Sequence, residues 1–347
     1  MPGWQAVLQA AVELRLAPAL VARLREKRAA RNIPALVLPS GMRTVTAMME
    51  TIWREHLERN GVLEDRLIEL LVAMNARGLE PVLLKGARSF ATGYPQWRSM
   101  RDLDLLLLGA DAARAHEVAL ELGYRPAAGS TEKAGKHHFQ TLFQDDLPGW
   151  LEIHRKAATH RAEDLPPTRL LQAMTVEAAV GATRARILAS PAHALHAIVH
   201  HHVGHRGDKG GGMDLKGLFE FCADVLAMDG PERAELLALA HRHPRLLAAL
   251  ELWVAAADTA FGLPVAPPLS LYPDATERAA RAMARSEEAG ARYGGVLEEL
   301  AFAGDADRLR RLPGGGTMLG RAALRGRTFG SMFRPMIDLF GRFQPDQ

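Results

Sequence analysis

Two aspartates separated by one residue, Asp102 and Asp104, form the pattern in this sequence with the clearest chemical meaning. They precede the apolar run 105–108. Because successive side chains of a strand point to opposite faces, the two carboxylates are expected on one face. Neighbouring carboxylates raise each other's pKa unless a cation lies between them, and Mg²⁺ prefers one or two carboxylates plus substrate phosphates. The pair therefore predicts a site for a metal-bound triphosphate.

Groups suited to phosphate lie just upstream, where the apolar run 82–84 ends in Lys85 and Gly86. A glycine lets the backbone approach a phosphate closely, the amides of a helix starting at 87–90 can bind its oxygens, and Lys85 adds a positive charge. Arg98 can bind phosphate through two parallel hydrogen bonds. For Arg98 and Arg101 the alternative is an ion pair with a nearby carboxylate, and for Arg101 that alternative is favoured.

A third acid follows in the segment 150–154, which is expected to be a strand. Glu152 and His154 are two residues apart, so they share a face of that strand. If the strand lies beside the one with Asp102 and Asp104, Glu152 completes a carboxylate triad.

Three motifs together resemble the uncharacterised nucleotidyltransferase family of the polymerase-β-like superfamily. They are L-K-G at 84–86, an arginine four residues before the D-x-D pair, and the sequence LEIHR at 151–155. The segments 190–200 and 224–226 are similar to the helical half of that family. The resemblance spans about 67–226, and D-x-D is its sharpest part.

The resemblance implies an α+β fold, with a small mixed sheet flanked by N-terminal helices and followed by an all-helical C-terminal domain. It implies a nucleoside triphosphate substrate, Mg²⁺ or Mn²⁺ as cofactor, and transfer of a nucleotidyl group to a hydroxyl of a small molecule or peptide. It also implies a role for each group of residues: Asp102, Asp104 and Glu152 for metal and catalysis; Lys85, Gly86, Ser89 and Arg98 for the nucleotide; His154, His196 and His200 for the acceptor cleft.

The sequence departs from the family pattern in ways that keep other functions open. Ala87 follows Gly86 where the superfamily has a phosphate-binding serine, so backbone, Lys85 or Ser89 must replace that contact. Ser99 and Arg155 replace a proline and a tryptophan. One alternative is a binding or scaffold protein that keeps the fold without the chemistry. Another transfers a phosphoryl or sugar group. Triphosphate binding with release of pyrophosphate distinguishes nucleotidyl transfer from both of these alternatives.

The elements that must position these residues are mainly helices. Helices are predicted over 5–31, broken at Pro18, and over 42–75 and 111–122, the last with Asp111 as N-cap. A hairpin-length turn joins strands 139–144 and 150–154, and strand patterns end after residue 157. Ser190, followed by Pro191, and Asp214 are expected to be the N-caps of two helices. These patterns predict an N-terminal helical segment (1–78), a catalytic core (79–158) and a helical domain (159–347).

Further patterns have competing interpretations. His193, His196 and His200 have helical spacing that suits zinc, but the favoured interpretation is that some of these histidines line the cleft. His137 and His138 are expected to be exposed. The glycine-rich segment 207–212 is expected to be a mobile lid over the acceptor. The arginines of the C-terminal segment suit a membrane surface or an acidic partner, although outward-facing arginines on a packed helix are favoured.

Composition only excludes some classes of protein. A net charge of +3 is too small to argue for nucleic acid, which is not expected as a partner. Cys222 is the one cysteine, so an intrachain disulfide is excluded and a reducing cytoplasm is expected. The polar N-terminal segment does not suit a signal peptide, and no apolar run reaches the roughly 20 residues of a membrane span.

Overall fold

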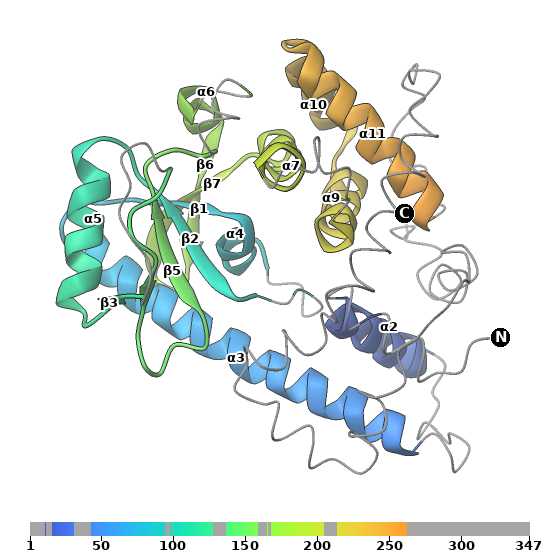
Figure 1. Cartoon of the computed structure of the whole chain (residues 1–347), viewed down its shortest axis with the longest axis horizontal. Coiled ribbons are helices and arrows are strands. Elements are labelled where there is room, and N and C mark those ends of the chain that lie inside the picture. The colour runs from blue at the N-terminus through green and yellow to red at the C-terminus, as the bar shows by residue number, and fades with distance from the viewer. Residues whose placement is uncertain are drawn as a thin grey trace.

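The computed structural model describes residues 11, 16–30, 43–93, 98, 100–127, 137–158, 165, 168–204 and 214–261. A seven-stranded mixed sheet lies beside a group of helices (Figure 1). The strands, in the spatial order β3-β4-β5-β2-β1-β7-β6, are β1 (Val82–Leu84), β2 (Asp102–Leu106), β3 (Arg125–Pro126), β4 (Leu142–Phe143), β5 (Trp150–His154), β6 (Thr175–Val180) and β7 (Thr183–Leu188). The helices are α2 (Ala17–Ala30), α3 (Arg43–Asn75), α4 (Lys85–Ala91), α5 (Ala110–Glu121), α6 (Thr168–Ala173), α7 (Ser190–Ile198), η2 (Val199–Gly204), α9 (Leu215–Ala227), α10 (Gly230–His241) and α11 (Pro244–Phe261). The α+β class is confirmed.

The three central strands bring the conspicuous sequence motifs together. β2 pairs antiparallel with β1 and parallel with β5. Asp104 is in register with Leu84 on one side and with Glu152 on the other. The condition set for Glu152, that its strand lies beside the D-x-D strand, is therefore met.

The alternation of side chains along β2 separates core from site. Leu103 and Leu105 are fully buried in a core shared with α3 and α5. Leu106 belongs to a second, smaller core on the opposite face of the sheet, with Leu171 of α6 and Ala192 of α7. Since Asp102 and Asp104 alternate with the leucines of the first core, both carboxylates project from this second face.

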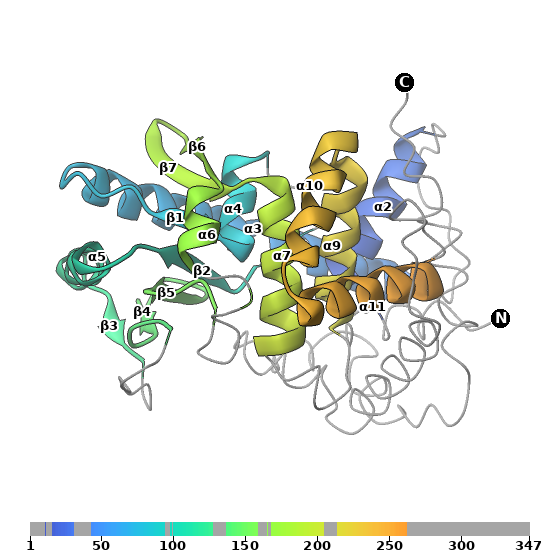
Figure 2. The same cartoon turned by 90° about the horizontal axis from the view of Figure 1, so that it is seen from above.

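Helix α3 connects the two halves of the molecule. Its C-terminal part packs on the sheet through one buried face, as the leucine spacing predicts: Leu63, Leu67, Leu70, Leu71 and Met74. Its N-terminal part places Met48, Met49 and Trp53 in the core of the helical half. Figures 1 and 2 show α3 running under the sheet and on to α2. The N-terminal segment therefore packs on both halves.

The helical half is formed by α7, α9, α10 and α11, with α2 packed against them. Asp214 is the N-cap of α9, as expected, because its side chain accepts hydrogen bonds from the backbone N–H groups of Lys216 and Gly217. α10 begins with a capping box between Asp229 and Glu232. These caps define where the helices begin and so which residues face the sheet.

Several sequence-based predictions were wrong in detail. Strands do not end after residue 157, because β6 and β7 form a hairpin that extends the sheet, with Gly181 at φ 58° in its turn. The N-cap of α5 is Gly109, not Asp111, and that of α7 is Ala189, not Ser190. The expected strand 139–144 is reduced to β4 and a single bridge between His138 and His154.

Two predictions fall outside the described residues: the lid at 207–212 and the role of the arginine-rich C-terminal segment. The proposed division into three domains remains a prediction. None of the described helices is long and apolar enough to cross a bilayer.

Candidate functional site

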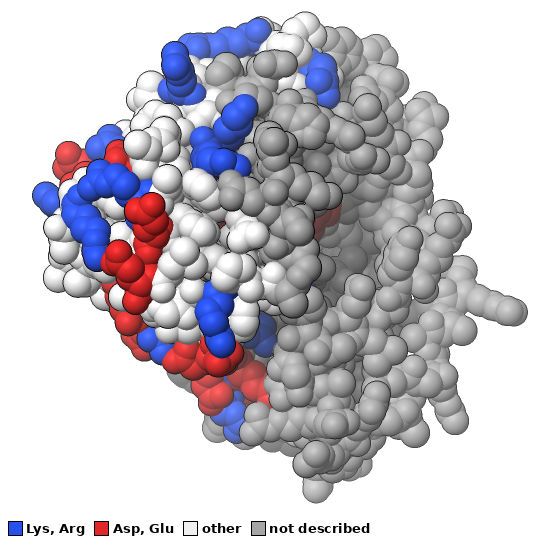
Figure 3. Space-filling view, turned by 60° about the vertical axis from the view of Figure 1, so that its left-hand side comes forward, with Lys and Arg blue, Asp and Glu red and all other residues white. Residues whose placement is uncertain are grey.

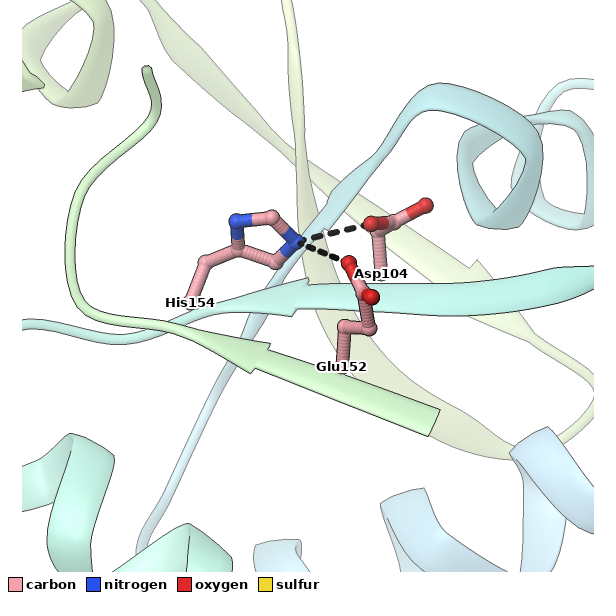
Figure 4. Close-up of side chains that lie close together, drawn as sticks. All are labelled: Asp104, Glu152 and His154. Carbon is pink, nitrogen blue, oxygen red and sulfur yellow. Dashed lines mark hydrogen bonds and ion pairs between the residues drawn. The ribbon is translucent and has the colours of Figure 1, made fainter. Parts of the chain in front are cut away.

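Asp104, Glu152 and His154 converge on the second face of the sheet, where β2 and β5 lie side by side (Figure 4). His154 Nε2 lies 2.7 Å from Oδ1 of Asp104 and 3.6 Å from Oε2 of Glu152. One ligand atom from each residue lies within 4.8 Å of the other two. Two carboxylates and an imidazole at this separation are a donor set for a divalent cation.

Asp104 is completely buried and carries the strongest electrostatic constraint of the site. Its Oδ1 accepts hydrogen bonds from His154 Nε2 and from Lys85 Nζ, each at 2.7 Å. Burial alone would raise the pKa of Asp104, but Lys85 and His154 outweigh it and hold this pKa far below its usual range. Its Oδ2 has no hydrogen-bond partner among the described residues. A buried anionic oxygen without a partner is suited to bind a cation.

The pKa of Asp102 is shifted in the opposite direction from that of Asp104. Burial and the neighbouring charge of Asp104 raise the pKa of Asp102 to about 6, even though Lys85 opposes this. The half-buried Asp102 is not among the three residues whose ligand atoms converge. A cation held by Asp104 would favour the ionised form of Asp102 and draw it into the site.

Lys85 is held in a conformation that lysine rarely adopts. Its φ is 45°, and it is the one non-glycine residue with positive φ in the described part of the chain. Such strain persists where the surroundings fix it, often at functional sites. Burial lowers the pKa of Lys85, but the charges of Asp104, Asp102 and Glu152 together raise it by more. Lys85 therefore stays charged.

Gly86 leaves room for a guanidinium group. A Cβ at Gly86 would lie 2.5 Å from Nη1 of Arg98 and 3.3 Å from Sδ of Met100. Arg98 is buried, and its Nη2 donates to Oε2 of Glu220 on α9 at 2.7 Å. Asn60 of α3 donates to its backbone carbonyl. Arg98 thus lies between the turn after β1 and the helical half.

Ala87 and Ser89 are both buried within α4. Ser89 is as buried as Arg98, and its contact with a terminal phosphate stays a prediction. Lys85 and Arg98 remain as the cationic candidates for that contact.

The three histidines expected at the acceptor cleft occupy different places. His154 lies among the carboxylates, where burial lowers its pKa and the hydrogen bonds to Asp104 and Glu152 raise it above its usual value. His196 is buried, with Nε2 2.8 Å from the carbonyl of Ala157 and a pKa lowered to about 3 by burial. It thus supports the segment after β5. His200 is half-buried in η2, its ring 6.2 Å from that of His196.

The zinc interpretation of the helical histidines gains no support within the described residues, where the triad of Asp104, Glu152 and His154 is the group suited to a metal. His193 is bonded to Asp224 at 2.9 Å, and His196 to a backbone carbonyl, so their rings do not share a ligand position. They serve packing and docking of α7.

Other residues of the site were missed from the sequence. His137 and His138 are half-buried, not exposed, with ring centroids 5.3 and 5.5 Å from that of His154. The backbone N–H groups of Arg155 and Lys156 bond to the carbonyl of His137 and hold this segment against β5. Glu220 and Lys216 of α9 approach from the helical half. Their spacing of four residues predicts that they share one face of a helix, and this was the available signal in the sequence.

The comparison with protein families agrees with this geometry. The family model described as "Uncharacterised nucleotidyltransferase" matches residues 1–261. No curated protein and no solved structure matches the chain significantly. The matched range includes α3, the whole sheet with its carboxylates, and the helices through α11. The chain therefore belongs to the uncharacterised nucleotidyltransferase family.

Proposed function

We propose that the protein transfers a nucleotidyl group from a nucleoside triphosphate, with Mg²⁺ or Mn²⁺, to a hydroxyl of a small molecule or peptide. The observation that carries this proposal is the convergence of Asp104, Glu152 and His154 beside a buried lysine. The unpartnered Oδ2 of Asp104 supports a cation at this place. Asp102, Asp104 and Glu152 would hold the metal, with His154 as a nitrogen ligand. The bound metal would neutralise charge on the triphosphate and on the attacking oxygen.

The chain's own side chains divide the remaining tasks. Lys85 stays charged and can bind a phosphate oxygen in place of Asp104. Arg98 lies against Gly86, in the turn after β1 that also holds Lys85. Glu152 has the most exposed carboxylate of the triad, with 22% of its side chain accessible. Burial raises the pKa of Glu152, but His154 together with the charges of Lys85 and His138 lowers it overall, so Glu152 is ionised and able to accept a proton.

In the transfer step, the acceptor oxygen bonds to the α-phosphorus while the bond from that phosphorus to the bridging oxygen breaks. Pyrophosphate leaves with the electron pair of that bond, and the proton of the hydroxyl passes to Glu152. Lys85 and Arg98 stabilise the charge that develops on the leaving pyrophosphate. Thr141 Oγ1 donates to Oε1 of Glu152 at 3.3 Å and orients the carboxylate.

The surface supports a small acceptor. On the face in Figure 3, basic and acidic side chains lie close together over the described part of the sheet half. In the sheet half, three arginines form ion pairs with acidic neighbours: Arg66 with Asp146, Arg77 with Glu121, and Arg125 with Asp145. In its described part this face therefore has no continuous basic track of the kind that nucleic acid requires.

Calorimetric titration with several nucleoside triphosphates tests the proposal without knowledge of the acceptor. Wild type should bind a triphosphate only with Mg²⁺ or Mn²⁺, and Asp104→Ala should abolish binding. Asp145→Ala, on the exposed surface, is the matched control and should bind normally. If wild type binds no triphosphate with either metal, the enzyme proposal fails and the binding or scaffold function remains. Binding followed by transfer of a phosphoryl or sugar group, without pyrophosphate release, would favour the third function.

A further inference from the structure

One face of α9 carries charged residues at every fourth position: Lys216, Glu220 and Asp224. Residues four apart lie above one another on a helix, so these three form a single stripe. The apolar residues of α9, such as Phe221 and Val225, are buried in the helical core. The charged stripe therefore faces away from that core, and its ion pairs show that it faces the sheet half.

Two of these residues hold cations that come from the sheet half. Asp224 lies 3.8 Å from Nη1 of Arg88 on α4, and its other oxygen bonds to His193. Glu220 bonds to Arg98 at 2.7 Å, and its second oxygen lies 3.6 Å from Nζ of Lys216. Both Glu220 and Arg98 are nearly inaccessible, with 13% and 10% of their side chains exposed. Figure 1 shows α9 next to α4 at this junction.

Lys216 belongs to the charged stripe on α9 through Glu220, whose Oε1 lies 3.6 Å from its Nζ. It is close enough to Asp102 to lower the pKa of that carboxyl against the effect of burial. It is more accessible than its partner, with 23% of its side chain exposed. On the other side, Arg98 lies against Gly86, next to Lys85. Lys216, Arg98 and Lys85 therefore lie along one series of contacts that runs from α9 through Glu220 to the turn after β1.

We infer that Lys216 and Arg98 are polyphosphate-binding residues and that Glu220 is a carboxylate that holds them in place until a triphosphate takes over their charges. This inference rests on the proposed function, since it assigns further residues to the same site. It gives the helical half a direct part in nucleotide binding.

Glu220 also limits the affinity for triphosphate. A fixed carboxylate near a highly charged anion repels it, and the anion must compete with Glu220 for Lys216 and Arg98. Removing the charge of Glu220 while keeping its shape should therefore tighten binding, whereas removing Lys216 should weaken it. Effects of opposite sign from two neighbouring residues distinguish this arrangement from a merely structural ion pair.

The test measures binding of tripolyphosphate and of a nucleoside triphosphate with Mn²⁺ by calorimetry. Lys216→Met should weaken both by roughly ten- to hundredfold, the range for a lost charge-assisted contact. It should not weaken binding of Mn²⁺ alone, because it removes a positive charge and no proposed metal ligand. Glu220→Gln should bind both anions several-fold more tightly. Arg242→Met, which removes one exposed positive charge from the helical half, is the matched control and should bind as wild type does.

Each result decides a different question. Wild type that binds no polyphosphate contradicts the proposed function itself. If wild type binds polyphosphate and Lys216→Met binds it with the same affinity, this inference is overturned and the proposed function remains intact. Weaker binding by Glu220→Gln would also overturn it, because Glu220 would then position Arg98 without competing for it. Tighter binding cannot arise from misfolding, so this variant remains decisive even if Lys216→Met is unstable.

Discussion

Nζ of Lys85 donates a hydrogen bond of 2.7 Å to Oδ1 of Asp104, and the carboxylate is completely buried. The lysine charge thus lies where the proposed metal would also act. In the absence of metal it acts with His154 to keep this buried carboxylate ionised. With metal and triphosphate bound, the same charge becomes available to a phosphate oxygen. One residue therefore stabilises the free protein and prepares the site for its ligand.

Lys85→Met should destabilise the metal-free protein. Breaking a buried ion pair by removing one partner leaves an uncompensated charge and costs about 3 kcal/mol. Mn²⁺ should restore part of this loss, because it supplies the missing positive charge at Asp104. Denaturant unfolding with and without Mn²⁺ measures both effects. Arg77→Met is the matched control, since its pair with Glu121 is exposed and should contribute less than about 1 kcal/mol. Equal stability of Lys85→Met and wild type would refute the role given to this pair.

Asp102→Asn should stabilise the metal-free protein at neutral pH. The pKa of Asp102 is raised from 3.8 to about 6, so its contribution to stability is present below pH 4 and is lost as pH rises through 6. An asparagine has no such loss, so the variant should exceed wild type by on the order of 2 kcal/mol at pH 7.5 and by little at pH 4.5. Unfolding in EDTA at both pH values gives the comparison.

The same substitution should weaken Mn²⁺ binding, because it removes a metal-binding carboxylate. A site residue that lowers stability while supporting function is expected where like charges are held together. Asp145→Asn, at an exposed ion pair, should change stability by less than about 0.5 kcal/mol at either pH. A difference between Asp102→Asn and wild type that does not grow with pH would show that the carboxyl of Asp102 is not perturbed as described.

The sequence predicted the central part of the site because it is encoded locally. The period of two placed Asp102 and Asp104 on one face, and the same rule placed Glu152 with His154. The pairing of β2 with β5 followed from the third motif. In contrast, Arg98 and Glu220 are 122 residues apart in the chain, and no local pattern indicates that they meet. Contacts of this kind depend on how α9 docks on the sheet.

The hairpin of β6 and β7 was missed for a different reason. Thr175–Val180 and Thr183–Leu188 contain alanine and charged residues, which suit a helix as well as a strand. The available signal was the glycine between the two runs, since Gly181 adopts φ 58° in the connecting turn. β7 then pairs with β1 in parallel, a long-range contact that supports the strand before Lys85. Tertiary pairing outweighed local preference here.

Gly86→Ala should lower triphosphate affinity by roughly tenfold, the effect of one displaced charged contact. Its Cβ would lie 2.5 Å from Nη1 of Arg98, so the guanidinium must move away from the turn after β1. Gly61→Ala is the matched control, because this glycine lies within α3 with no atom within 4 Å of a new Cβ. It should stabilise the helix by about 0.5–1 kcal/mol and leave binding unchanged. Unchanged binding by Gly86→Ala would mean that the place of Arg98 does not matter for the nucleotide.

His154→Gln should change which metal the site prefers. Nε2 of His154 lies 2.7 Å from Oδ1 of Asp104 and within reach of Glu152, so it can become a nitrogen ligand when its proton is lost. Imidazole favours transition metals, whereas Mg²⁺ prefers oxygen ligands. The variant should therefore lose about tenfold more affinity for Mn²⁺ than for Mg²⁺, a scale typical of a lost ligand or of its support. Competition titrations with the two ions measure this ratio.

His196→Gln provides the control for that measurement. His196 is buried like His154, but it bonds to the carbonyl of Ala157 and not to the carboxylates. Its replacement should lower the free energy of unfolding and leave the ratio of Mn²⁺ to Mg²⁺ affinity unchanged. If His154→Gln instead weakens both ions equally, its ring orients Asp104 without binding the metal. The cation would then be held by oxygen atoms alone, and Mg²⁺ would be favoured as the cofactor.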